Sequence, residues 1–486
     1  MKAQTIRKPH PDFQYIRLAD EIEDKVAQRI YKTGEKLPSI RDLHRQLGLS
    51  ISTIHQTYIE LERRGLVESR QKSGFYIKPV FKNILPQPSL KRCCKTPKKI
   101  TFTTLADEIK ESITDPDMLN FGSAVPDIRL FPAKHLSRLV KSISVKDMDR
   151  FLLTYEKSNG ALDLRRQLAQ RSLGNSQSVT EDEILITNGC IEAVSFCLRA
   201  VAKPGDTIVV ESPTYYGFLQ LLEDLKMYAL ELPTDPETGP DLNALKQALT
   251  ANPVKACLFT PSFQHPLGYS MPDENKKTLI DLLNRHEVPV IEDDLFGELY
   301  FNKTRPATLK SFDTKGLVLY CSSISKTLGP GIRIGWTMPG RYYDTVRRLK
   351  RYSSLSSPGL NQHLVAEFLK SGSYDRHLRS LRNALKNQMS NMTLAIQKYF
   401  PNDTKVTAPK GGLLLWLELN KNVDSLELYQ EALRCNIAVL PGILCSSTPK
   451  YKNYIRLSCG LPWSDRVEQG MVTLGKIIFQ LSKPKA

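Results

Sequence analysis

Several side chains in the second half of the sequence have the types and spacing of a site for an aldehyde cofactor. Lys326 lies in the segment CSSISKTLGPGIRIGW, among small residues and next to apolar ones. A lysine desolvated in such surroundings has a lowered pKa and can form an imine with an aldehyde. Arg333 follows seven residues later and could grip a phosphate, while Ser323 and Ser325 add hydroxyl donors. Each residue taken alone would also fit a loop without function.

Further positions could complete such a site. Gly189, Cys190 and Ile191 begin a predicted helix, and the free N–H groups of a helix start suit an anion. Asp293, in VIEDDLFGELYF, follows a predicted strand, where its carboxylate could keep a pyridine nitrogen protonated and make the ring an electron sink. Tyr215, in ESPTYYG, could stack on the face of that ring.

The elements that must position these residues follow from an alternation of short apolar runs with helical segments such as Glu274–His286. Alternation of this kind predicts an α/β domain with a mostly parallel sheet, in which ligands bind beyond the carboxyl ends of the strands. Gly189, Asp293 and Lys326 each follow a predicted strand. The predicted strands cover Ile184–Thr187, Thr207–Glu211, Ala256–Thr260, Pro289–Ile291 and Leu317–Cys321.

Composition and charge indicate how many domains the chain has and what kind of partner it binds. The chain has 486 residues, of which 41% are hydrophobic and 24% charged, and this predicts a globular protein of two or three domains. The net charge is +17, and residues 1–100 hold 21 Lys and Arg against 10 Asp and Glu. This basic end predicts a polyanionic partner, or else a tail that only aids solubility.

Targeting and cysteine patterns favour the cytoplasm. The start, MKAQTIRKPHPDF, has no apolar core and does not predict a signal peptide. The most apolar stretch, Ile184 to Ala202, is interrupted by polar residues, so no membrane span is expected. The nine cysteines are scattered without a CxxC pair, which favours reduced thiols and no metal site.

The N-terminal region has the pattern of a DNA-binding motif. Two short helices are expected, the first after Ser39 and the second after Ser50, joined by a turn at Gly48. Strands over Leu66–Arg70 and Phe75–Lys78 would follow as a hairpin, or wing. The second helix presents small polar residues and a glutamine, which can reach base edges. A helical cap without a DNA role is the alternative.

The run LPSIRDLHRQLGLSISTIHQTYIELERRGLVESRQKSGFYI resembles the winged helix of GntR-type proteins over nearly its whole length. A Leu-His pair at residues 43–44 replaces the family's usual Leu-Ala. The resemblance implies DNA contacts from Arg41 and the Ser52-Thr53 region, with Tyr58 near the DNA backbone. The complete set of candidate DNA-binding residues is Ser39, Arg41, Ser52, Thr53, Gln56, Tyr58, Lys72 and Gly74.

The region from residue 119 to 486 resembles fold-type I pyridoxal-phosphate enzymes of the class I/II aminotransferase group. The matching segments include NFGSAVPDIRLFP, ITNGCIEAV, TPSFQHPLGYSM, YCSSISKTLGPGIRIGW and YIRLSCG, in family order. The resemblance makes Lys326 the lysine that binds the cofactor covalently, Asp293 the partner of the ring nitrogen, Tyr215 the stacking ring and Arg333 the phosphate ligand. It makes Arg456 the grip for the α-carboxylate of an amino acid. Tyr155 would reach the phosphate of a partner subunit, which implies a homodimer.

Two positions depart from the group at the cofactor's phenolic oxygen. His265 stands where the group commonly has Asn, and Phe296 where it commonly has Tyr. Loss of the Tyr hydroxyl should raise the pKa of the imine and slow amine exchange. His265 could compensate in part, or Phe296 could be a tolerated apolar substitution.

The sequence therefore predicts a winged helix-turn-helix over residues 1–78, a basic, proline-containing linker over 79–118 and a fold-type I aminotransferase-like α/β domain over 119–486. This order of domains resembles the MocR subfamily of GntR-type regulators. The resemblance implies a cytoplasmic, dimeric transcription factor that binds double-stranded DNA and senses pyridoxal 5'-phosphate, an amino acid or amine effector, or their adduct. The alternatives are a working aminotransferase with a DNA-binding appendage, and a winged helix that contacts protein.

Overall fold

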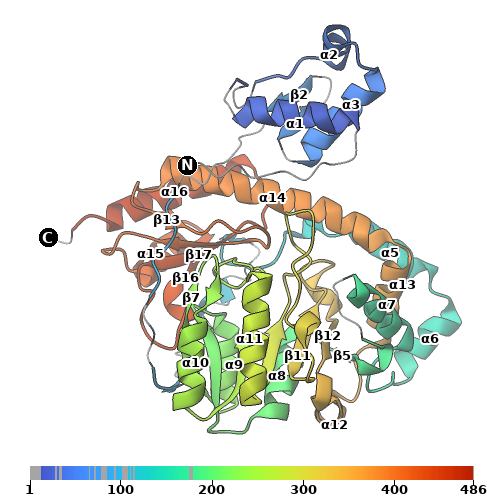
Figure 1. Ribbon diagram of the computed structural model, residues 1–486, viewed down its shortest axis with the longest axis vertical. Coiled ribbons are helices and arrows are strands. Elements are labelled where there is room, and N and C mark those ends of the chain that lie inside the picture. The colour runs from blue at the N-terminus through green and yellow to red at the C-terminus, as the bar shows by residue number, and fades with distance from the viewer. Residues whose placement is uncertain are drawn as a thin grey trace. The chain divides into compact units, whose positions relative to one another are not determined.

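A computed structural model divides the chain into two compact units, Met1–Ile84 and Leu85–Ala486 (Figure 1). The residues that it describes are 13–27, 30–31, 35–64, 66–70, 73–77, 85–91, 93, 95–100, 108–109, 111–112, 115, 117–174 and 179–484.

The N-terminal unit has the helix-turn-helix and the hairpin that the sequence predicts. Before α2, Ser39 Oγ accepts a hydrogen bond from the N–H of Asp42 at 3.1 Å. Before α3, Ser50 Oγ accepts from the N–H of Thr53 at 3.1 Å. Gly48 ends α2 with a φ of 67°, the left-handed conformation that a glycine adopts without strain. The elements are α1 (Gln14–Ala27), α2 (Ile40–Leu47), α3 (Ile51–Arg63), β1 (Val67–Arg70) and β2 (Gly74–Ile77).

The core of this unit lies between α1 and α3. Leu18 and Ile22 on α1 pack with Ile54 and Leu61 on α3, and all four side chains are buried. The antiparallel hairpin pairs Val67 with Ile77 and closes the same core. The apolar spacing of both helices thus stabilises the unit and leaves their other faces exposed.

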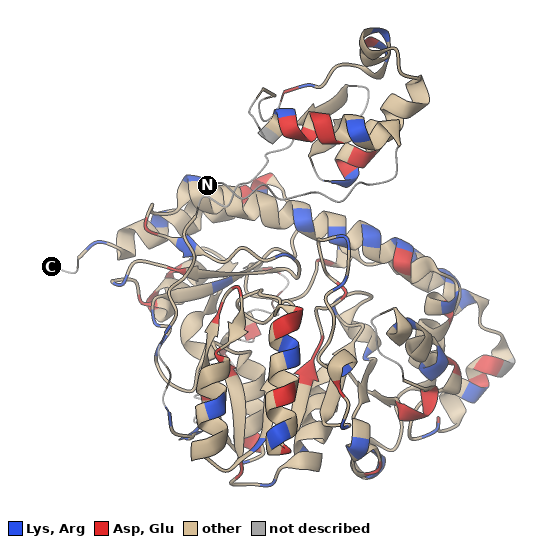
Figure 2. Cartoon of the chain, in the orientation of Figure 1, with Lys and Arg blue, Asp and Glu red and all other residues tan. Residues whose placement is uncertain are grey.

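An ion-pair cluster fastens the end of α3 to α1, where Figure 2 shows the acidic residues in red. Arg64 Nη1 lies 2.5 Å from Asp20 Oδ1 and 2.6 Å from Glu23 Oε2. Arg64 Nε lies 2.9 Å from Glu60 Oε1. The guanidinium of Arg64 therefore stabilises the helix packing.

The larger unit is built on a mostly parallel sheet, as the sequence predicts. Neighbouring strands β7, β6, β9, β10 and β11 are parallel, whereas β12 is antiparallel to both β11 and β5. The spatial order is β3-β7-β6-β9-β10-β11-β12-β5, and β8 pairs with β7. The strands are β3 (Lys98–Lys99), β5 (Leu185–Thr187), β6 (Thr207–Ser212), β7 (Tyr228–Asp235), β8 (Gly239–Pro240), β9 (Val254–Phe259), β10 (Val290–Asp293), β11 (Val318–Ser323) and β12 (Gly335–Met338).

Helices cover both faces of this sheet, because successive strand residues point to opposite sides. On β6, Val209 packs in the core that contains Leu245 of α10 and Leu279 of α11. Its neighbour Val210 packs in the opposite core, with Val194 of α8. These helices are α8 (Cys190–Val201), α9 (Tyr216–Asp224), α10 (Leu242–Ala251), α11 (Asp273–His286) and α12 (Tyr343–Ser354).

A second sheet, of order β13-β14-β17-β16, occupies the C-terminal part of the unit. The long helix α14, orange in Figure 1, runs from α13 to α16. No helix within the described ranges is both long and apolar enough to cross a membrane. The remaining elements are β4 (Leu119–Asn120), α5 (Ala133–Ser142), α6 (Val145–Leu153), α7 (Leu162–Leu173), α13 (Gly359–Lys370), α14 (Ser373–Tyr399), β13 (Lys405–Val406), β14 (Leu414–Glu418), α15 (Ser425–Arg434), β15 (Ile437–Ala438), β16 (Leu440–Pro441), β17 (Tyr454–Ser458) and α16 (Asp465–Leu481).

Part of the predicted linker over 79–118 packs on the larger unit. Pro86 O accepts a hydrogen bond from the N–H of Val406 at 2.9 Å. The N–H of Ser89 donates to Glu418 Oε2 at 2.6 Å. Farther along, β3 adds to the edge of the main sheet, antiparallel to β7. The sequence did not predict this packing, because added strands bind through backbone groups and need no apolar periodicity.

Candidate functional site

The candidate DNA-binding residues that the structure describes lie on α2 or directly before it, on α3 and on β2. On α3, Ser52 and Gln56 are exposed and Thr53 is half-buried. At the start of α2, Arg41 is exposed. These four side chains belong to one helix-turn-helix, and their contact with DNA stays a prediction. Ser39 and Gly74 are also exposed, and Lys72 lies outside the described residues.

Tyr58 is the exception, because the structure gives it a packing role. Its side chain is 0% exposed, and its hydroxyl donates to Pro38 O at 2.7 Å. Its ring lies 4.9 Å from that of Phe75 on the hairpin. The prediction that Tyr58 contacts DNA is therefore wrong: the side chain points from α3 into the core and leaves no polar atom on the surface.

In the larger unit, a cavity of about 270 Å³ brings together most of the residues predicted for the cofactor. It lies beyond the carboxyl ends of β10 and β11. Gly189 directly precedes the lining residue Cys190, and Ser323 Oγ lies 2.7 Å from Oγ of the lining residue Ser325. The predicted residues that line it are Cys190, Ile191, Tyr215, His265, Asp293, Ser325, Lys326, Arg333 and Arg456, and Phe296 lines it too.

Lys326 follows β11, and its side chain is half-buried at the cavity. Burial, and after it the positive charge of Arg456, lower the pKa of its amine to about 8. The carboxylate of Asp293 opposes this shift, and Arg333 reinforces it. A pKa so near neutrality leaves part of the amine uncharged, and the uncharged amine is the nucleophile for an aldehyde.

Asp293 is the last residue of β10, at the end of the sheet that faces the cavity. Burial raises the pKa of its carboxyl and a hydrogen bond from the Cys190 thiol opposes this rise, so that the pKa comes to about 6. The thiol Sγ and the N–H of Leu295 both lie 3.1 Å from the same oxygen, Oδ1. The sequence predicted only a backbone role for Cys190, since no spacing rule connects residues that lie 103 positions apart.

Arg333 and the start of α8 form a cradle at one end of the cavity. Arg333 Nη2 donates to Asn188 O at 2.6 Å. Gly189 has a φ of 104°, and a Cβ atom there would lie 2.5 Å from Arg333 Nη2. Ser325 Oγ lies 2.7 Å from Ser323 Oγ, and Ser323 also donates to Ile334 O. A guanidinium, a helix start and a serine hydroxyl together suit a phosphate group.

Tyr215 and His265 form a wall of the same cavity. Their ring centroids lie 4.7 Å apart at an angle of 36°. Burial holds the pKa of His265 well below its usual range, and the charges of Arg456 and Lys326 act in the same direction. His265 is therefore neutral, and its Nε2 accepts from Arg456 Nη1 at 2.6 Å. Phe296 is 2% exposed and packs in an apolar cluster.

Arg456, on β17, is a buried cation at the cavity. Its side chain is 2% exposed, Nη1 meets His265 and Nη2 donates to Gly122 O. Nε is buried and has no hydrogen-bond partner among the described residues. Burial lowers the pKa of Arg456, although an arginine stays charged. A buried guanidinium whose neighbours are neutral favours an anionic ligand.

Tyr155 lies outside this cavity. Its side chain is 84% exposed and lines a separate open hollow with residues of α12. The predicted contact with a partner subunit needs such an exposed position.

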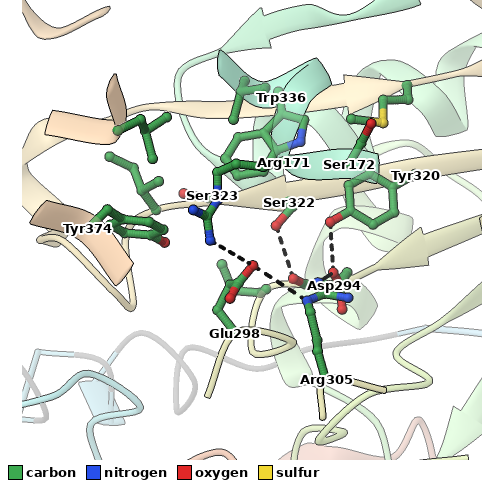
Figure 3. Close-up of a pocket in the computed structure, with 15 residues that line it drawn as sticks. Arg171, Ser172, Asp294, Glu298, Arg305, Tyr320, Ser322, Ser323, Trp336 and Tyr374 are labelled. Atoms are coloured by element: carbon green, nitrogen blue, oxygen red, sulfur yellow. Dashed lines mark hydrogen bonds and ion pairs between the residues drawn. The ribbon is translucent and has the colours of Figure 1, made fainter. Parts of the chain in front are cut away.

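A buried polar network that the sequence analysis missed lies behind the site (Figure 3). Asp294, the neighbour of Asp293, pairs with Arg305 and accepts a hydrogen bond from the Tyr320 hydroxyl at 2.7 Å. Ser322 Oγ donates to Asp294 O at 3.0 Å. These contacts fix the chain directly after Asp293. The second aspartate of VIEDDLFG was the available signal. Ion pairs extend the network to Glu298, Arg171 and Arg382.

Comparison with known proteins agrees with this architecture. The model of the family "Aminotransferase class I and II" matches residues 116–466, and that of "Bacterial regulatory proteins, gntR family" matches residues 14–77. The HTH-type transcriptional regulators YjiR and YdcR of Escherichia coli are 36% and 35% identical. Each alignment covers 96% of this chain and 99% of the relative.

A solved structure gives the same result for the larger unit. The α-aminoadipate aminotransferase LysN of Thermus thermophilus, solved with N-(5'-phosphopyridoxyl)-L-leucine, is 27% identical and has a TM-score of 0.72. The match covers 79% of this chain and 96% of LysN. The chain therefore belongs to the aminotransferase class I and II family and, with its GntR-family domain in front, to the MocR subfamily of GntR-type transcriptional regulators.

Proposed function

We propose that this chain is a DNA-binding transcription regulator whose larger unit binds pyridoxal 5'-phosphate and senses an amino acid or amine. The observation that carries the proposal is the joint placement of Lys326, Asp293 and Arg456 around one cavity. One cavity thereby offers pyridoxal phosphate a lysine for covalent attachment and a carboxylate for its ring nitrogen. It also offers the amino acid an arginine that can bind its carboxylate.

The residues at the cavity fit pyridoxal phosphate. When bound, this cofactor supplies an aldehyde for an amine and a ring that withdraws electrons. Lys326 supplies the amine, Asp293 holds a proton at the ring nitrogen, and Tyr215 covers the ring. Arg333 binds the phosphate together with the start of α8. The cradle at Gly189, which a Cβ atom would fill, supports this fit.

Arg456 supports an α-amino acid as effector over a simple amine. Its buried Nε has no hydrogen-bond partner among the described residues, and a carboxylate would satisfy it. Neutral His265 orients the guanidinium through Nε2, which accepts its hydrogen bond, and the ring has no positive charge that would compete with Arg456 for the anion. Arg456 therefore binds and orients the effector.

We propose that effector binding changes the affinity of the winged helices for DNA, through residues between 79 and 118. A coupling free energy of about 1–3 kcal/mol, or roughly 5- to 150-fold in affinity, would be enough. We further propose a cytoplasmic homodimer in which Tyr155 meets the partner's cofactor phosphate. The exposure of Tyr155, Leu153 and Tyr352, at 84%, 78% and 80%, supports such an interface.

The test is an absorbance spectrum of the purified full chain incubated with pyridoxal phosphate. We expect a near-visible band that persists after removal of free cofactor and that changes with specific amino acids. Repeating the titration with operator DNA should shift the effector affinity. A chain that stays colourless after incubation contradicts the proposal for the larger unit.

A working aminotransferase is the second candidate, because Lys326, Asp293 and Arg456 are all at one cavity. Single-turnover absorbance with candidate amino acids distinguishes the two functions. Rapid conversion to the pyridoxamine form, reversed by a keto acid, would favour the enzyme. Slow or absent conversion with a lasting spectral change would favour the sensor.

The DNA-binding part of the proposal has its own test. The chain should retard a fragment from upstream of its own gene in an electrophoretic assay, and the affinity should fall steeply with salt because phosphate contacts release counterions. No retardation at low salt would favour a winged helix that contacts protein.

A further inference from the structure

The thiol of Cys190 contacts the carboxylate that would face the cofactor ring. Cys190 is the first residue of α8 and is 7% exposed. Its Sγ lies 3.1 Å from Asp293 Oδ1, and both residues line the cavity. The N–H of Leu295 donates to the same oxygen, also at 3.1 Å.

Two donors on one carboxylate oxygen fix the plane and the rotation of the group. The donors come from different elements, α8 and the segment after β10, so Asp293 is held from two sides. With Oδ1 occupied, Oδ2 is the oxygen that remains to accept a proton from a ligand. Both oxygens of a carboxylate can accept hydrogen bonds. Here Oδ1 accepts from the protein, and Oδ2 is left for the ligand.

The chemistry of the contact favours a protonated thiol next to a charged carboxylate. Burial and the negative charge of Asp293 hold the pKa of the Cys190 thiol well above its usual range. The hydrogen bond in turn lowers the pKa of Asp293 and offsets part of the rise that burial causes. Cys190 is thus a donor here and not a nucleophile, because a nucleophile requires the thiolate.

The neighbouring cysteine on the same helix has different surroundings. Cys197 is 0% exposed, and its Sγ lies 3.3 Å from Thr337 Oγ1 and 3.6 Å from Cys321 Sγ. Those contacts belong to the core between α8 and the sheet. Cys197 therefore serves as a matched control, being a buried cysteine of α8 that does not line the cavity.

We propose that Cys190 is a positioning residue for the cofactor: its thiol holds Asp293 Oδ1 so that Oδ2 presents a charged acceptor to the ring nitrogen. Because Cys190 is also the first residue of α8, one residue contacts Asp293 and belongs to the helix start that would bind the cofactor phosphate. This inference rests on the proposed binding of pyridoxal phosphate.

The experiment compares Cys190→Ala, Cys190→Ser and Cys197→Ala in the full chain, each incubated with pyridoxal phosphate labelled with ¹⁵N in the ring. The ¹⁵N chemical shift reports ring protonation, and an absorbance titration reports affinity. We expect Cys190→Ala to move the shift toward the unprotonated ring and to weaken binding roughly 3- to 30-fold, the range for a weak donor to a charged acceptor. Cys190→Ser keeps a donor and should stay near wild type, as should Cys197→Ala.

The outcomes separate this inference from the proposed function. A wild-type ring signal and affinity in Cys190→Ala would overturn the inference alone. Equal losses in Cys190→Ala and Cys190→Ser, with the same fall in apo thermal stability as Cys197→Ala, would show general packing and would also overturn it. A wild-type chain that does not bind the cofactor would overturn both.

Discussion

Lys326 is the residue whose titration should control attachment of the cofactor. Its pKa of about 8 lies below the usual value for lysine, because the site is buried and Arg456 is positive. The uncharged amine attacks an aldehyde, so the attachment rate should rise with pH and level off above about 8. At pH 7 roughly a tenth of the amine is uncharged, far more than for an exposed lysine.

Stopped-flow absorbance with added pyridoxal phosphate between pH 6.5 and 9.5 measures this dependence. Lys326→Ala should form no band while keeping its thermal stability, and Lys370→Ala, at an exposed position, should behave as wild type. An unchanged spectrum in Lys326→Ala would refute the assignment of the lysine.

Arg456 should act on both the effector and the cofactor lysine. Arg456→Met removes the buried cation, so we expect amino-acid affinity to fall by about ten- to a hundred-fold while pyridoxal phosphate still binds. Because Arg456 lowers the pKa of Lys326, the midpoint of the attachment profile should also move to higher pH. Parallel titrations of the two ligands check this. Equal loss of both would point to a collapsed site.

At the scale of elements, the start of α8 sets the phosphate cradle. Gly189→Ala would place a Cβ atom 2.5 Å from Arg333 Nη2 at a φ of 104°. We expect weaker cofactor binding and a stability loss of about 1–3 kcal/mol. Gly205 is a matched control, with a φ of 90° but no atom within 4 Å of its Cβ position. Gly205→Ala should cost stability without changing cofactor affinity.

In the helix-turn-helix, substitutions of exposed residues should lower DNA affinity, whereas substitutions of buried residues should lower stability. Gln56 and Arg41 are exposed, so Gln56→Ala and Arg41→Ala should weaken operator binding and leave cofactor binding unchanged. Tyr58→Phe removes the hydrogen bond to Pro38 O, so it should lower stability by about 1 kcal/mol and keep DNA affinity. Fluorescence anisotropy and thermal melts measure the two effects. A DNA-binding loss in Tyr58→Phe without a stability change would restore the sequence-based assignment.

At the scale of the whole molecule, the proposed coupling requires that binding of the amino acid in the larger unit changes the affinity of the winged helix for DNA. An effective amino acid should change operator affinity in the wild-type chain by roughly 5- to 150-fold. Lys326→Ala should retain operator binding but lose this response. Anisotropy titrations with and without the amino acid measure both. A full response in Lys326→Ala would mean that the signal does not pass through the lysine.

The sequence by itself determined the local elements and the chemical types at the site. Helix caps at Ser39 and Ser50, the glycine turn and the alternation of strands and helices depend on neighbouring residues, so they could be predicted. Lys326 and Asp293 were found because strand ends of an α/β domain lie at one edge of the sheet.

Only the tertiary structure decided which atoms meet. The contacts of Cys190 with Asp293 and of His265 with Arg456 join residues 103 and 191 positions apart, and no periodicity encodes them. The burial of Tyr58 depends on how α3 packs against the hairpin, and the pairing of β3 depends on the free edge of β7. Such contacts arise from the relative placement of elements, which is fixed by the burial of the whole core.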